Sequence, residues 1–136
     1  MKIVIPGMKD QQKLVLEQST KEAIKILKDN LNAPRIEAEL EIDESEYSNS
    51  HLLEKGKGWE APHPDIVRAY FNQFQAALDE YSTDKKLAQL LGLSSDRRIR
   101  AYKKGDDKAP YGLWHQFLVI TGRAPQQPLK VLAIFN

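Results

Sequence analysis

The residues with the clearest potential chemistry are the cations of residues 84–105, DKKLAQLLGLSSDRRIRAYKKG. Between Arg97 and Lys108 there are six cations and two acids. Arginine side chains can pair bidentately with guanine edges, and lysine and arginine also bind phosphate oxygens. The first 60 residues carry a net charge of −3 and the remainder +4, so the positive field is local. This chemistry predicts double-stranded DNA as a partner.

The spacing of apolar residues predicts which side of the basic segment faces outward. Ile99 and Tyr102 are its only large apolar residues, and they define a buried helical face. At about 100° per residue, the opposite side holds Arg97, Arg100, Ala101 and Lys104, and Arg98 and Lys103 flank its boundary. The expected contacts to base edges are Arg97, Arg100 and Ala101. The expected contacts to phosphates are Ser95, Arg98, Lys103, Lys104 and Lys108.

A second short helix is expected just before the basic one. Asp84 can cap it, and leucines at positions 87, 90 and 91 share one face. Gly92 can end this helix because glycine adopts left-handed backbone angles, and Gly105 can end the basic helix in the same way. Ser94, Ser95 and Asp96 are each suitable caps for the basic helix.

Two apolar helices are expected to flank this pair. Residues 65–81 form a wide apolar face after Pro64, and residues 111–121 form another before Gly122. A helix pair cannot bury its own core, so it needs these neighbours. The sequence therefore predicts a four-helix domain over residues 64–124.

The central segment resembles the Cro/repressor-type (Xre-like) helix-turn-helix family over residues 65–124. It departs from the family pattern by one extra residue in the turn, because Ile99 lies seven positions after Gly92. The resemblance implies sequence-specific DNA binding by a homodimer, with residues 95–104 as the recognition helix. The matching residues are Leu87, Ala88, Leu91, Gly92, Leu93, Ser94, Ile99, Tyr102 and Gly105.

The N-terminal part predicts a small α+β unit over residues 1–43. Residues 1–5 fit a strand, and residues 12–17 fit either a strand or a helical turn. Ser19 and Glu22 have the spacing of a capping box, which predicts a helix behind them. Residues 35–43 alternate apolar and acidic side chains, as in a strand with one solvated face.

The remaining segments complete the expected organisation. Residues 44–63 are rich in small and polar side chains and predict a linker. Residues 125–136 end in an apolar, β-prone run that predicts a C-terminal strand. The expected fold class is α+β, mainly α. The N-terminal unit would serve dimerisation or partner binding.

Composition argues against several other classes. The chain has no cysteine, and its three histidines lack the spacing of metal ligands. No nucleophile arrangement or phosphate-binding loop is present, so neither an enzyme nor a cofactor is expected. No run is apolar enough to span a bilayer, so no membrane partner is expected and a cytoplasmic location is the simplest.

A second interpretation of the same helices stays open. They could form a protein–protein interaction module, such as an antitoxin-like or assembly factor. A regulator, most simply a repressor that occludes a promoter, is the preferred interpretation because the cations share a helix with suitable turn and capping residues.

Overall fold

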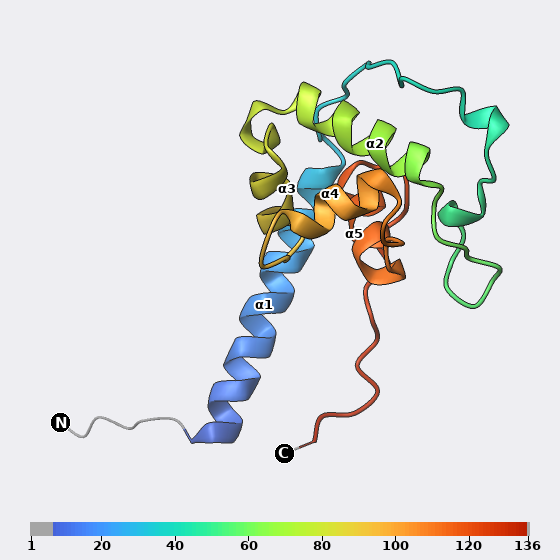
Figure 1. Ribbon diagram of the computed structural model, residues 1–136. Helices are drawn as coiled ribbons and strands as arrows, with labels where there is room; N and C mark the ends of the chain where they lie inside the picture. Colours follow the sequence, from blue (N-terminus) through green and yellow to red (C-terminus); the bar gives the residue numbers. More distant parts are fainter. Residues whose placement is uncertain (1–6, 136) are drawn as a thin grey trace. The chain divides into compact units, whose positions relative to one another are not determined.

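The computed structural model describes residues 7–135 and contains only helices and loops over that range (Figure 1). The chain divides into two compact units. One contains the helix α1 (Met8–Asn30) and the segment from Leu129 onward, and the other spans Glu37–Pro128. The expectation of an α+β fold is therefore wrong for the described residues, because no strand lies among them.

The N-terminal helix is longer than the sequence pattern indicated. α1 begins after Gly7 and runs through the expected capping box without a break. The Ser19 hydroxyl donates to the carbonyl of Leu16 at 3.1 Å, as a residue in the middle of a helix can. The prediction of a helix start at Ser19 is wrong, since no proline or glycine interrupts residues 8–30 and the helix extends upstream. Residues 12–17 are helical.

Neither of the two described segments that were expected to be strands forms one. Residues 35–43 and 128–135 have no strand partner in the described chain, and a strand needs a neighbouring backbone. In the first segment only Leu40 and Ile42 pack against the core, while Ile36 is 54% exposed. The alternation therefore reflects two docked side chains rather than a sheet face. The strand expected over residues 1–5 lies outside the described residues.

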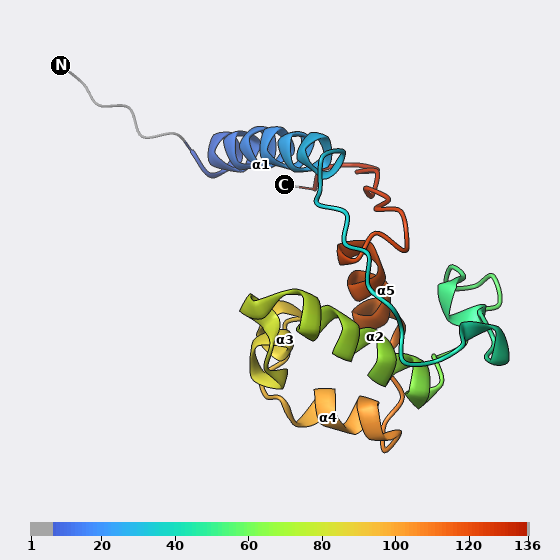
Figure 2. The same cartoon turned by 90° about the horizontal axis from the view of Figure 1, so that it is seen from above.

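The second unit contains the four helices expected for residues 64–124 (Figure 2). α2 ends at Ala77, four residues early, and a short 3-10 turn, η3 (Asp79–Tyr81), follows it. This break allows the Tyr81 ring to stack on Phe74 at 5.5 Å between centroids. The helices are α2 (Pro64–Ala77), α3 (Asp84–Leu90), α4 (Arg97–Lys104) and α5 (Tyr111–Ile120).

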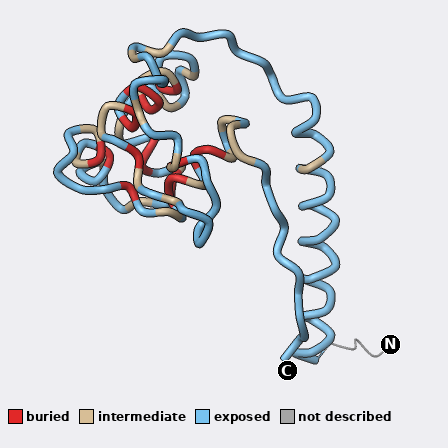
Figure 3. The backbone as a smooth tube through the Cα atoms, turned by 90° about the vertical axis from the view of Figure 1, so that its right-hand side faces the viewer, coloured by how far each residue is buried: buried red, intermediate tan, exposed pale blue. Residues whose placement is uncertain are grey.

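One aromatic-rich core holds the second unit together (Figure 3). Trp114 of α5 is fully buried and stacks on Tyr70 of α2 at 5.6 Å. Full burial of each large apolar side chain contributes about 1.5–3 kcal/mol relative to exposure. The largest fully buried side chains are Trp114, Tyr70, Phe71, Phe117, Ile66, Leu87, Ile99, Leu118 and Val67.

Residues 44–63 were expected to be a linker, but they lie inside the second unit. They contain two short 3-10 turns, η1 (Glu44–Glu46) and η2 (Ser50–Leu52). His51 is only 3% exposed, and its Nδ1 accepts a hydrogen bond of 3.1 Å from the Trp114 indole. The Trp59 indole donates to the His51 carbonyl, also at 3.1 Å. These bonds attach the segment to the core rather than leaving it free.

Candidate nucleic-acid interface

A left-handed glycine separates α3 from α4. Gly92 has φ +75°, a conformation that side chains with a Cβ disfavour. The N–H of Leu93 donates to the Ala88 carbonyl at 2.8 Å, and that of Gly92 donates to Gln89 at 3.2 Å. This pair of bonds is a Schellman motif, which ends the helix and turns Leu93 toward the core. The turn residue and its direction agree with the sequence-based prediction.

The two faces of α4 differ as its pattern indicated. Ile99 is 0% exposed and Tyr102 is 4% exposed, so both anchor the helix in the core. Ala101 is half-buried between the two faces. The predicted contact residues that are exposed to solvent are Ser95, Arg97, Arg98, Arg100, Lys104 and Lys108.

Lys103 differs from the other predicted phosphate contacts. Its ammonium donates at 2.8 Å to both Asp84 Oδ1 of α3 and Gln75 Oε1 of α2. Only 16% of the Lys103 side chain is exposed. A phosphate contact by this ammonium would require both bonds to break. The structure thus gives Lys103 a direct part in joining three helices.

The same cluster holds Asp84 in its charged form. Partial burial acts to raise the pKa of this carboxyl group, but hydrogen bonds from Lys103 and Gln75 oppose it. The positive charges of Lys103 and Arg100 add to that opposition, and the net result is a lowered pKa. Asp84 was expected to cap α3; Thr83 does so instead, accepting from the Lys86 N–H at 3.3 Å.

Arg100 forms an ion pair within its own helix. Its Nη1 lies 2.7 Å from Asp96 Oδ2, and the two side chains are 48% and 38% exposed. Asp96 is the N-cap residue of α4, yet its side chain makes no capping hydrogen bond. The carboxylate is therefore directed to the guanidinium rather than to the helix end.

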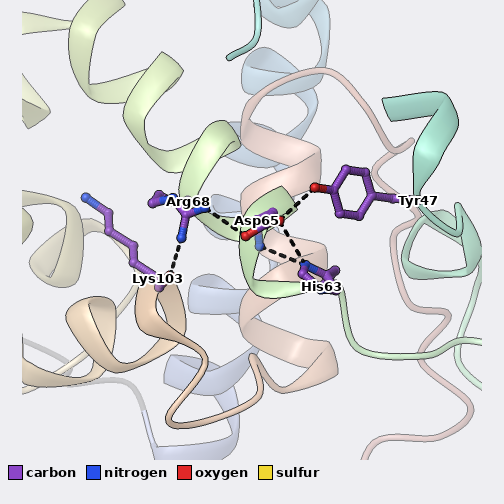
Figure 4. A network of polar contacts seen from close by, with 5 residues as sticks. All are labelled: Tyr47, His63, Asp65, Arg68 and Lys103. Atoms are coloured by element: carbon purple, nitrogen blue, oxygen red, sulfur yellow. Dashed lines mark hydrogen bonds and ion pairs between the residues drawn. The ribbon is translucent and has the colours of Figure 1, made fainter. Parts of the chain in front are cut away.

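The C-terminal end of α4 is fixed against α2. Gly105 has φ +86°, and an added Cβ would come within 2.8 Å of Pro64 Cγ. The Arg68 Nη1 donates to the Lys103 carbonyl at 3.3 Å, while its Nη2 donates to Asp65 Oδ1 at 2.7 Å. These contacts hold the last turn of the basic helix in one orientation (Figure 4).

Further hydrogen bonds connect the start of α2 to residues 44–63. The Tyr47 hydroxyl donates to Asp65 Oδ2 at 2.7 Å, and His63 Nδ1 accepts from the Asp65 N–H at 3.0 Å (Figure 4). The bonds from Tyr47 and then Arg68 lower the pKa of Asp65, and the bond to Asp65 raises the pKa of Tyr47. The segment expected to be a linker thus contributes to positioning α4.

Sequence reasoning missed the acidic partners of this interface. Asp96 and Arg100 are four residues apart, a spacing that brings side chains together on a helix, so this pair could have been found. Asp84 and Lys103 are far apart in sequence, and no local signal joins them. Tyr47 and Asp65 likewise come together only through the fold.

Two features are absent from residues 7–135. No group of histidine, aspartate or glutamate side chains in this range could hold a metal ion. None of the helices described is long and apolar enough to cross a membrane. Comparison of the chain with protein-family models, curated proteins and solved structures found no match.

Proposed function

We propose that this chain is a sequence-specific, double-stranded-DNA-binding transcriptional regulator, and that it acts in the cytoplasm as a repressor. α3, the turn at Gly92 and α4 would serve as a helix-turn-helix, with α4 in the major groove. Arg97, Arg100 and Ala101 would read base edges. Bound at a promoter, the protein would exclude other proteins from the same DNA.

One observation carries this proposal: α4 is anchored by two buried residues and presents arginines on its outward side. Ile99 and Tyr102 are buried, while Arg97, Arg98 and Arg100 are exposed. A rigid helix with an outward cationic side suits groove binding, because its position is set before DNA arrives. Lys104 and Lys108 extend the exposed cations and would contact phosphates. Lys103 is not among these contacts, because its ammonium joins α4 to α2 and α3.

We further propose that two copies act together. In the first unit, large apolar side chains are exposed along α1, including Ile26 at 56% and Ile24 at 47%. Leu132 and Phe135 in the C-terminal segment are 91% and 93% exposed. Large apolar side chains left in water favour association with a further surface. A homodimer would place two copies of α4 in successive major grooves, about 34–36 Å apart.

Selection of bound duplexes from a random pool tests the proposed function directly. The expected result is enrichment of a pseudo-palindromic sequence whose half-sites lie about one helical turn apart. The Arg97→Ala and Arg100→Ala variants should each lose preference at different positions. Lys55→Ala, an exposed cation outside α1, α3 and α4, is the matched control and should keep the wild-type preference. Recovery of unenriched sequences would contradict base reading.

The exposed apolar residues of the first unit also favour a second candidate, a protein–protein interaction module. In that case the cations would serve solubility or bind an acidic protein. Retention on heparin, together with a gel shift using random duplex, separates the two candidates. A DNA-binding regulator should give both signals and lose them as salt is raised. An interaction module should give no gel shift.

A further inference from the structure

We propose that Asp96 positions Arg100 for a guanine and weakens the binding of other sequences. This inference rests on the proposed function of α4. Asp96 Oδ2 lies 2.7 Å from Arg100 Nη1, on the exposed side of the helix. The carboxylate makes no capping bond, so its role lies with the guanidinium.

The contact leaves the guanidinium able to read a base. Arginine carries five N–H donors in a planar fork, and the ion pair with Asp96 involves only Nη1 at one end of that fork. A guanine needs two donors, for O6 and N7. A free arginine side chain samples many rotamers, and binding restricts it to one, at a cost in conformational entropy. A fixed fork loses less entropy, so the Asp96 contact favours one bidentate geometry at Arg100.

The charge of Asp96 acts in the opposite direction on DNA of the wrong sequence. A carboxylate beside the groove repels phosphates and partly neutralises Arg100. Non-specific binding depends almost entirely on such charges, whereas a guanine contact adds directional bonds. One residue would therefore lower the affinity for random duplex and keep the affinity for the correct site, which is how repulsive elements create specificity.

This role differs from a contribution to stability. The pair lies at the surface, with both side chains more than a third exposed, and such pairs contribute little to folding. A purely structural Asp96 would change binding to every duplex equally. Loss of a positioning Asp96 instead reduces the preference for the correct site over random duplex.

The test uses the full chain and a duplex selected by the wild-type protein. Each guanine is replaced in turn by 7-deazaguanine, which lacks the N7 acceptor. The guanine read by Arg100 is the one whose replacement weakens the wild-type protein but not Arg100→Ala. For the wild type we expect a loss of about 5- to 150-fold at this position.

The variant Asp96→Asn keeps the shape of the side chain and removes its charge. We expect its loss at that guanine to be at least about threefold smaller than the wild-type loss, and its affinity for random duplex to rise about twofold. Asp107→Asn, in the exposed loop after α4, is the matched control. It removes the same charge and should leave the guanine dependence unchanged. Asp96→Glu, which can still pair at this spacing, should restore part of that dependence.

Each outcome decides the inference. Equal guanine dependence in Asp96→Asn and Asp107→Asn would overturn the role of Asp96 while leaving DNA binding in place. The absence of any guanine that depends on Arg100 would overturn it as well. If the wild-type protein bound no duplex at all, the proposed function itself would fall, before any variant is compared.

Discussion

The ammonium of Lys103 lies 2.8 Å from the carboxylate of Asp84 and joins α4 to α3 across 19 residues of sequence. Gln75 of α2 accepts a second bond from the same ammonium. The relative orientation of the two helices that would contact DNA is thus set by a partly buried polar cluster as well as by apolar packing.

Loss of this ion pair should destabilise the second unit. In Asp84→Asn the Lys103 charge is left without its counterion, and we expect the free energy of unfolding to fall by about 1–3 kcal/mol. Urea denaturation provides the measurement. Lys104→Ala, an exposed neighbour, should stay within about 0.5 kcal/mol of the wild type. Equal stability of the two variants would show that the Lys103 contact carries no energy.

The buried His51 should make stability depend on pH below neutrality. Burial lowers the pKa of His51; the nearby Glu44 carboxylate opposes this effect, and the charge of Arg123 adds to it. In the unfolded chain His51 binds a proton near pH 6.5, whereas the folded chain resists protonation. Its contribution to stability is therefore complete above pH 6.5 and is lost as the pH falls below that value.

Urea denaturation at several pH values between 7.5 and 5 measures this dependence. His51→Gln should flatten it, even though its absolute stability is lower. His115→Gln, at a half-buried histidine that stacks on Tyr111, is the control and should keep the wild-type slope. A slope that survives in His51→Gln would assign the pH dependence to other groups.

Glycine at position 105 should be required, unlike glycine at position 112. Gly105→Ala would place a Cβ 2.8 Å from Pro64 Cγ at a positive φ, so we expect a loss of more than about 1 kcal/mol. Gly112→Ala, inside α5 with no atom near the added Cβ, should be neutral or stabilise by up to about 1 kcal/mol. Thermal unfolding of the two variants makes the comparison. A similar midpoint for both would contradict the close approach of α4 to α2.

The second unit was largely predictable because its signals are local. Gly92 and Gly105 mark helix ends, and the apolar spacing at Ile99 and Tyr102 identifies the buried face of α4. The placement of Lys103 was not predictable, since its partners Asp84 and Gln75 come from other helices. The local sequence pattern around a lysine at the edge of a helical face does not show whether its ammonium lies in solvent or contacts a carboxylate.

The prediction of strands was wrong for a different reason. Of the alternating apolar side chains in residues 35–43 only Leu40 and Ile42 dock on the core, and a strand also needs a partner backbone, which the sequence does not supply. The contribution of residues 44–63 was missed because small and polar residues resemble a linker. His51 and Tyr47 attach this segment to α5 and α2 through single hydrogen bonds that no periodic pattern reveals.

Substitution of Arg100 should weaken both affinity and base preference. Arg100→Ala removes the expected bidentate contact and should cost about 1–3 kcal/mol on the selected duplex, with a smaller loss on random duplex. Fluorescence anisotropy on both duplexes measures the difference. An equal loss on every sequence would assign Arg100 to phosphates rather than to bases.

The most direct test of the central claim, that the exposed side of α4 binds duplex DNA, is the affinity of the wild-type protein for duplex across a range of salt. Fluorescence anisotropy between about 50 and 200 mM salt should show affinity falling by orders of magnitude, as several phosphate contacts are screened. The double variant Arg97→Ala, Arg100→Ala should bind more weakly at each salt concentration. A salt-independent affinity, or equal binding by wild type and double variant, would contradict the claim.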